Sequence, residues 1–235
     1  MSKKIAIITA RGGSKRIPRK NIKDFCGKPI IAYSIEAALS AKIFDEVMVS
    51  TDDQEIAEIS KKYGANVPFM RSDETSNDYA TTEDVLLEVL MQYRKMGAEF
   101  DYICCLYPTA PFVTSEKIRI AMNIMESKKP EQILPMVEYS FPPQRSNIIN
   151  ENGFAEYKFP QYQTTRSQDL EKWYHDAGQF YIYNVKKFLE CNGKCTEFIP
   201  LILSELEVQD IDNDLDWKLA ELKFRLLLER EENSN

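Results

Sequence analysis

The first half of the chain alternates between two hydrophobic patterns. Short apolar runs bounded by turn residues are typical of buried strands, and apolar residues at helical spacing are typical of helices with one buried face. The runs predict strands at residues 5–10, 46–50, 67–70, 102–107 and 133–137. The helical spacing predicts helices at residues 29–39, from Asp52 or Asp53 to Tyr63, 81–96 and 115–125.

Alternating strands and helices predict an α/β fold with a mostly parallel sheet covered by helices on both faces. Residues 139–176 interrupt this order, because they are rich in Pro, Gln, Tyr, Asn and Arg and have no clear period. Beyond them, strands at 177–183 and 207–211 and a helix at 213–230 are predicted. We therefore expect an α/β domain formed by residues 1–138 and 177–235, with an irregular β arm at 139–176.

Composition and charge narrow the classes of protein. The 235 residues carry a formal net charge of -7, so a general nucleic-acid surface is not expected. No apolar run approaches the roughly 20 residues of a membrane span, and the N-terminal run is interpreted as a strand rather than a signal peptide. With 5 cysteines and no export signal, we expect a reduced, cytoplasmic protein.

Basic residues gather in the segment that follows the first predicted strand. Its members include Arg11, Lys15, Arg16, Arg19 and Lys20, around the pair Gly12-Gly13. Glycines permit tight turns that direct backbone amides at an anion, and the cations add to that attraction, so the loop suits a triphosphate. It matches neither the Walker A loop nor the dinucleotide fingerprint. The alternative is a solvated basic turn.

An acidic pair, Asp210 and Asp212, lies near the end of the predicted domain. On an extended segment residues i and i+2 share a side, so both carboxylates can face one ligand. Mg²⁺ prefers one or two carboxylates together with phosphate oxygens and water. The alternative is helix capping by Asp212 or Asn213.

Residues 8–21 resemble the nucleotide-binding signature of the CMP-sugar synthetases, cytidylyltransferases that activate sialic acids and related nonulosonic acids. Other similar segments follow in the family's order: Phe69-Met70-Arg71 with Glu74 and Asp78, then residues 106–111 and 208–212. Residues 140–145, 165–170 and 174–181 resemble the pseudaminic acid branch of the family. Thr9 replaces a usual proline, and Tyr107 replaces a glutamine common in sialic acid synthetases, which argues against sialic acid itself.

The resemblance implies a GT-A-like nucleotide-diphospho-sugar transferase fold, the substrates CTP and a nonulosonic acid, and Mg²⁺ held by Asp210 and Asp212. The implied catalytic residues are Lys20, Arg11 and Asp212. The expected nucleotide-binding residues are Ala10, Arg11, Gly12, Gly13, Ser14, Lys15, Lys20, Asn21, Arg71 and Thr82. Of Thr81 and Thr82, either of which can simply cap a helix, we favour Thr82 for the nucleotide.

Arginine binds carboxylates bidentately, so Arg166 is expected to hold the carboxylate of the sugar acid. The full set expected at the sugar is Tyr107, Arg166, Gln168, His175, Gln179 and Phe180. The family dimerises through such an arm, so a homodimer is expected, with Arg145 either at the dimer contact or near the partner's sugar site. Kdo-type, legionaminic or sialic acid activation, and a non-catalytic nucleotide sensor, remain open alternatives.

Overall fold

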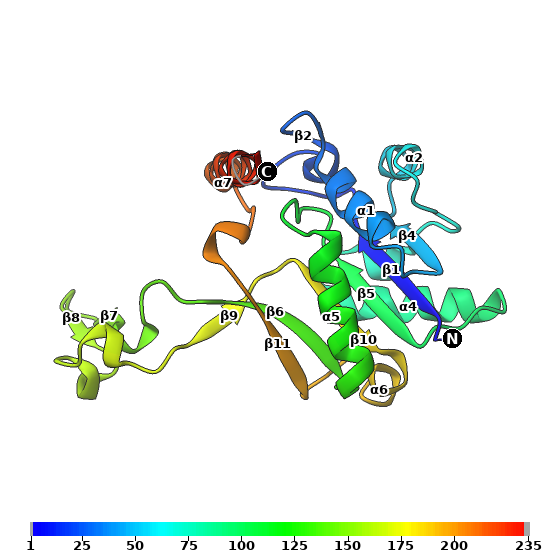
Figure 1. The fold of residues 1–235 in the computed structure, drawn as a ribbon. Helices are drawn as coiled ribbons and strands as arrows, with labels where there is room; N and C mark the ends of the chain where they lie inside the picture. The colour runs from blue at the N-terminus through cyan, green and yellow to red at the C-terminus, as the bar shows by residue number, and fades with distance from the viewer. Residues whose placement is uncertain (1, 233–235) are drawn as a thin grey trace.

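A mixed seven-stranded sheet forms the centre of the protein in this computed structural model, which describes residues 2–232 (Figure 1). The strand order is β11-β6-β10-β5-β1-β4, and β9 also pairs with β6. The strands are β1 (Lys4–Thr9), β4 (Glu46–Ser50), β5 (Tyr102–Leu106), β6 (Gln132–Glu138), β9 (Tyr174–Asp176), β10 (Phe180–Asn184) and β11 (Phe198–Leu203). Only β9 and β10 run against the other strands of this sheet, so the predicted fold class is confirmed within the described residues.

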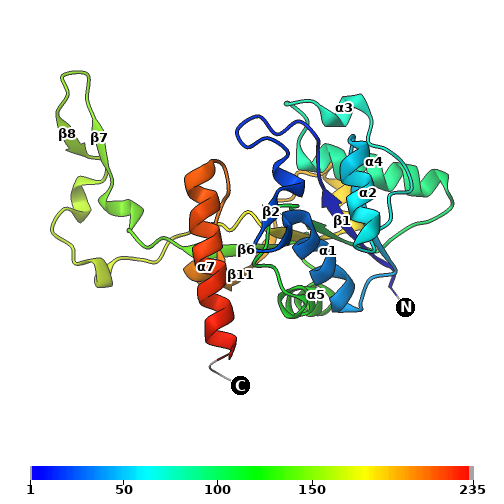
Figure 2. The same ribbon diagram turned by 90° about the horizontal axis from the view of Figure 1, so that it is seen from above.

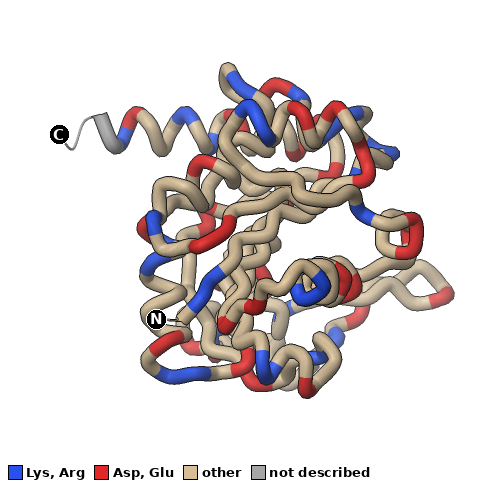
Figure 3. Tube along the Cα trace, turned by 90° about the vertical axis from the view of Figure 1, so that its right-hand side faces the viewer, with Lys and Arg blue, Asp and Glu red and all other residues tan. Residues whose placement is uncertain are grey.

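Helices cover both faces of the sheet. They are α1 (Ile30–Ala41), α2 (Gln54–Lys62), α3 (Asp73–Ser76), α4 (Thr82–Lys95), α5 (Ser115–Lys128), α6 (Val185–Glu190) and α7 (Asp214–Glu232). The alternation of side chains along β1 shows the two layers: Ala6 and Ile8 pack with α1 and α5, whereas Ile5 and Ile7 pack with α4 and α6. Figure 3 shows Lys, Arg, Asp and Glu interspersed along the outer segments, while the strands through the centre are largely uncharged.

A third apolar cluster attaches α7 to the small hairpin of β2 (Asp24–Phe25) and β3 (Lys28–Pro29). Ile17, Phe25, Ile211 and Trp217 are buried in it. Ile17 lies in the basic loop and Ile211 lies between Asp210 and Asp212. This cluster therefore brings the basic loop and the acidic pair together.

Residues 139–173 leave the body and extend away from the sheet (Figures 1 and 2). They contain the hairpin of β7 (Asn147–Ile149) and β8 (Ala155–Tyr157), whose residues are all exposed, and three short 3-10 turns. This segment coincides with the predicted arm except for β9, which returns to the central sheet.

Two expectations about the elements were wrong, and one strand was not predicted. Residues 67–70 form no strand, because Pro68 lacks an amide hydrogen and only Asn66 bridges to Met48. Residues 207–211 are also not a strand, since the late strand is β11, residues 198–203. The pattern did not reveal β11 because Pro200 interrupts it, and proline is tolerated there because β11 is at the sheet edge.

Within the described residues, no helix is long and apolar enough to cross a membrane.

Candidate nucleotide-binding site

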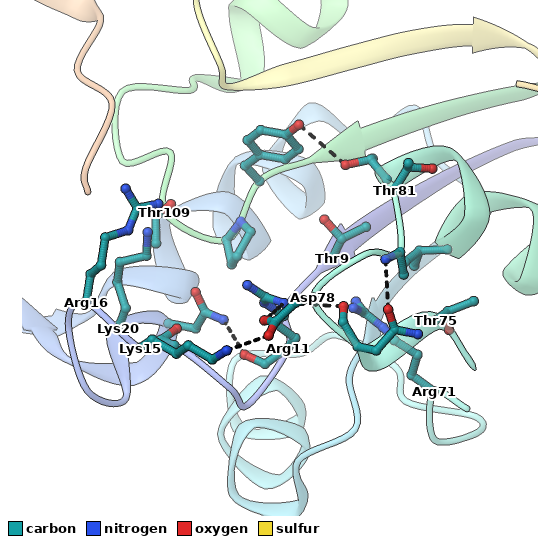
Figure 4. A pocket seen from close by; sticks show the side chains of 18 of the residues that line it. Thr9, Arg11, Lys15, Arg16, Lys20, Arg71, Thr75, Asp78, Thr81 and Thr109 are labelled. Carbon is teal, nitrogen blue, oxygen red and sulfur yellow. Dashed lines mark hydrogen bonds and ion pairs between the residues drawn. The ribbon is translucent and has the colours of Figure 1, made fainter. Parts of the chain in front are cut away.

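A pocket of about 650 Å³ opens at the carboxyl ends of β1 and β5, beside the start of α4. Its described lining includes five cations and a single carboxylate, Asp78. The cations are Arg11, Lys15, Arg16, Lys20 and Arg71 (Figure 4). This excess of positive charge makes the pocket suitable for a polyanion.

The carboxylates of Asp52 and Asp53 hold the basic loop in place. The Gly12 amide donates to Asp52 Oδ1 at 2.8 Å, and a Cβ on Gly12 would lie 2.8 Å from Asp53 Oδ2. Asp53 caps α2 by accepting from the Ile56 amide at 3.0 Å. Gly12 is therefore required for close packing, and the anion that its amide faces is the Asp52 carboxylate. Gly13 has nothing within 4 Å of such a Cβ.

Arg19, from the same loop, has a structural role. Its backbone has a φ of 55°, and its guanidinium donates to both oxygens of Asp53, at 2.5 and 3.0 Å, and also to Glu55. Hydrogen bonding to Arg19 lowers the pKa of Asp53. This residue therefore connects the basic loop to the start of α2 and is not among the cations that line the pocket.

Lys20 and Asn21 line the pocket, and their side chains each donate to a backbone carbonyl. The Lys20 ammonium donates to the Ile211 carbonyl at 2.7 Å, and burial lowers its pKa although Asp212 and Asp210 act to raise it. The Asn21 amide donates to the Arg11 carbonyl at 2.8 Å and is buried. Lys20 thus has a cationic group within reach of both the pocket and the acidic pair.

The acidic pair is not used to cap a helix. Asn213 Oδ1 accepts from the amides of Leu215 and Asp216 at 2.9 and 3.1 Å, so Asn213 caps α7. Asp212 instead forms an ion pair with Arg16 at 2.7 Å, and Asp210 is exposed. A ligand could reach Asp210 directly, whereas at Asp212 it would have to displace Arg16.

These donors fit a Mg²⁺ ion whose other ligands are phosphate oxygens and water. Among residues 2–232 there is no group of three or more His, Cys, Asp or Glu side chains that would hold a metal unaided. A two-carboxylate site is what Mg²⁺ uses when a nucleotide supplies the remaining oxygens. The fit is therefore to a metal that arrives with its nucleotide.

Arg71 and Thr82 both line the pocket as predicted. Arg71 is buried, donates to the Ser50 carbonyl at 2.6 Å and to Ser50 Oγ at 3.0 Å, and has its pKa lowered by burial. Thr81 caps α4 through a capping box with Asp84, which leaves Thr82 free of that task. The Thr82 hydroxyl lies 3.4 Å from the hydroxyl of Tyr107.

The structure brings together most, but not all, of the residues expected at the nucleotide. The predicted residues in the pocket lining are Arg11, Ser14, Lys15, Lys20, Asn21, Arg71, Thr82 and, from the sugar set, Tyr107. Ala10, Gly12 and Gly13 are not in the lining, and the Ala10 amide donates to the Ser50 carbonyl at 2.9 Å.

The other residues expected at the sugar are dispersed. Phe180 is fully buried in the core with α1 and α5, so its assignment to a sugar contact was wrong for this conformation. Gln179 is buried beside Tyr107, and its Nε2 donates to the Glu207 carbonyl at 2.5 Å while its Oε1 has no partner among described residues. The His175 ring packs against the Tyr139 ring, with 4.7 Å between the ring centroids.

Arg166 and Gln168 lie in the arm, outside the pocket lining of their own chain. Arg166 Nε donates to Asp169 Oδ2 at 2.7 Å. Figures 1 and 2 show that the arm points away from the body, so these two side chains cannot contact a ligand bound in this pocket without a second subunit or a large movement.

Two charged residues of the pocket lining, Arg16 and Asp78, were not selected from the sequence. Arg16 was only one of several clustered cations, and Asp78 was only part of a family-like segment. Asp78 contacts residues more than 60 positions away in sequence, with separations of 67 and 63 to Arg11 and Lys15, so no local pattern could reveal it.

A mostly parallel sheet with a cationic pocket at its carboxyl edge and an acid pair beside it defines an α/β nucleotide-binding transferase. Residues 5–213 match the family described as Cytidylyltransferase, and the chain belongs to this family of nucleotidyltransferases.

Similar proteins agree with this membership. The chain is 40% identical over 230 residues to the pseudaminic acid cytidylyltransferase of Campylobacter jejuni, covering 95% of this chain and 97% of that protein. It is 33% identical to the CMP-N,N'-diacetyllegionaminic acid synthase of Legionella pneumophila, covering 94% of this chain and 96% of that protein. A solved structure of CMP:2-keto-3-deoxy-manno-octonic acid synthetase complexed with CTP has a TM-score of 0.67 at 19% identity, covering 97% of this chain and all of that chain, which supports the fold.

Proposed function

We propose that this protein transfers CMP from CTP to a nonulosonic acid, pseudaminic acid, with release of pyrophosphate. The observation that carries the proposal is the pocket described above, in which five cations of the described chain face one carboxylate, within the residues that define the cytidylyltransferase family. The choice of sugar rests on the 40% identity to a pseudaminic acid cytidylyltransferase and on Tyr107 in the pocket lining.

In this proposal the triphosphate lies along Arg11, Lys15 and Lys20. These cations attract the phosphates and offset the negative charge that grows on the bridging oxygen as pyrophosphate leaves. Arg11 and Lys15 reach the pocket from the loop after β1, whereas Lys20 is held by the Ile211 carbonyl. The ribose and base would lie toward Asn21, Arg71 and Thr82, which are other polar residues of the pocket lining.

Asp210 and Asp212 would hold Mg²⁺, which when bound neutralises phosphate charge and polarises the α-phosphoryl group. The chain's own contribution is to position these carboxylates: Ile211 is buried between them and Asn213 performs the capping. Arg16, now paired with Asp212 at 2.7 Å, would turn toward phosphate when that carboxylate takes a metal.

The reaction itself requires one bond to form and one to break. The anomeric hydroxyl oxygen of the sugar acid attacks the α-phosphorus, the bond from that phosphorus to the bridging oxygen breaks, and the hydroxyl proton is lost to a base. No covalent enzyme intermediate is needed. Tyr107, whose hydroxyl lies 3.4 Å from that of Thr82, would contact the sugar.

A homodimer completes the proposal. The arm exposes large apolar side chains, with Phe141 at 87%, Ile149 at 71% and Phe154 at 70% exposure, which a second subunit would cover. Arg166 and Gln168, which lie outside their own chain's pocket, would then reach the sugar in the partner's site. All 5 cysteines are free thiols, in keeping with the cytoplasmic location that we include in the proposal.

A turnover assay with a panel of sugar acids tests the proposal. Pyrophosphate release is measured with CTP, Mg²⁺ and pseudaminic, legionaminic, N-acetylneuraminic or Kdo acid, each against a reaction without sugar. We expect the highest kcat/KM with pseudaminic acid. Binding of CTP without turnover on any of the four acids would favour a nucleotide sensor and overturn the proposal.

A further inference from the structure

A carboxylate lies among the cations of the pocket. Asp78 Oδ1 accepts from Arg11 Nη1 at 3.0 Å, and Asp78 Oδ2 accepts from Lys15 Nζ at 2.5 Å (Figure 4). Hydrogen bonding from Lys15 lowers the pKa of Asp78, so the side chain is anionic. Its two oxygens therefore engage two of the cations that the proposed function assigns to the triphosphate.

The segment between α3 and α4 holds Asp78 in this position. Asn77 Oδ1 accepts from the amides of Tyr79 and Ala80, at 2.8 and 3.0 Å, and forms a tight turn around Asp78. The Asn77 carbonyl also accepts from Arg11 Nη1 at 3.4 Å. The turn is therefore ordered by its own side chain and by the basic loop together.

The contact is reversible without any cost in core packing. The side chain of Asp78 is 47% exposed and that of Lys15 is 75% exposed. Tyr79, the next residue, is 94% exposed. Asp78 can therefore leave the two cations by a local rearrangement of the turn, while the strands and helices around the pocket stay in place.

We propose that Asp78 is an intramolecular competitor for the polyphosphate, which sets the affinity of the pocket for CTP and pyrophosphate. The inference rests on the proposed function. Arg11 and Lys15 have a limited number of donors, so a phosphate and the carboxylate exclude one another there. The several charges of a triphosphate displace a single carboxylate more readily than the smaller charge of a monophosphate does, and the returning carboxylate assists the release of pyrophosphate.

Isothermal titration calorimetry of inorganic pyrophosphate and of CTP, each with Mg²⁺, tests this role in the full-length chain. Asp78→Asn removes the competing charge, and Asp78→Glu retains it. Asp73→Asn is the matched control, because Asp73 is an exposed acid of the same segment and does not line the pocket. All three variants alter exposed side chains, so each should fold like wild type. Circular dichroism checks this.

Exposed ion pairs are weak individually, so we expect Asp78→Asn to tighten pyrophosphate binding about twofold to tenfold. Asp73→Asn should change it less than twofold, Asp78→Glu should stay close to wild type, and the gain should shrink at high salt. Product inhibition by pyrophosphate should strengthen in Asp78→Asn in proportion.

Unchanged or weaker pyrophosphate binding in Asp78→Asn would overturn the inference while leaving the proposed function intact, provided wild type binds CTP. A similar gain in Asp73→Asn would also overturn it, since a general charge effect would then explain the result. Failure of every variant to bind CTP or pyrophosphate would refute the proposed function, and the competitor role with it.

Discussion

Replacing Gly12 by alanine should disturb the basic loop and the start of α2 together. The new Cβ would lie 2.8 Å from Asp53 Oδ2 and 2.9 Å from Asp53 Cβ. The second contact involves an atom attached to the backbone, so a side-chain rotation cannot relieve it. Asp53 would have to move away from the Ile56 amide that it caps and from Arg19.

The magnitude follows from these two effects. Loss of a helix cap costs about 1 kcal/mol, and an extra methyl group in a tightly packed position costs roughly 1–3 kcal/mol. For a domain of this size the combined loss should lower the melting temperature by roughly 4–16 °C. Arg11 and Lys15 flank the displaced turn, so KM for CTP should rise as well.

Differential scanning calorimetry and CTP kinetics measure the effect, with Gly13→Ala as the matched control. Gly13 has no atom within 4 Å of the added Cβ and is not among the glycines with positive φ, so its melting temperature should stay within about 2 °C of wild type. In an Asp53→Gly background, which removes the contacted atoms, Gly12→Ala should cost less by about 1 kcal/mol. Equal melting temperatures for the two alanine variants, or an unchanged cost in that background, would refute the reasoning.

Three further predictions concern other parts of the molecule. Asp212→Asn should reduce kcat at least about a hundredfold because it weakens the proposed metal site, whereas Asp214→Asn should not; equal activities in a Mg²⁺-dependent assay would contradict this. The low pKa of Asp53 means that its contribution to stability is complete above about pH 4 and is lost as pH falls through the folded value. The denaturation midpoints of wild type and Asp53→Asn should therefore converge in acid. A gap that widens there would exclude the Arg19–Asp53 pair as the source of this stability. Deleting residues 146–161 should give a monomer that binds CTP with weak sugar turnover; a fully active monomer in light scattering would refute the arm's assignment.

The sequence predicted the parts of the fold that depend on local pattern. Strands β1, β4 and β5 are short apolar runs buried on both sides, whereas β6 alternates buried and partly exposed residues; the positions of all four agree with prediction to within about two residues. β11 was missed because Pro200 interrupts it, although its pairing with β6 is continuous. The antiparallel direction of β10 also depends on tertiary pairing, which no local pattern records.

The candidate site divides in the same way. Lys15 and Lys20 were predicted because they follow a buried strand, where ligands collect in such sheets. The distinction between Arg19, which pairs with Asp53, and its neighbours in the pocket depends on a left-handed backbone at Arg19. Phe180 was misassigned because its strand is apolar on both faces, so the sequence could not separate a core residue from a ligand contact.

The most direct test of the central claim is phosphorus NMR of a reaction that contains the enzyme, Mg²⁺, CTP and pseudaminic acid. Each CTP consumed should yield one pyrophosphate and one phosphodiester signal from CMP-pseudaminic acid, and omission of the sugar should leave CTP intact. Appearance of CDP and inorganic phosphate, or CTP that persists unchanged beside the sugar acid, would contradict it.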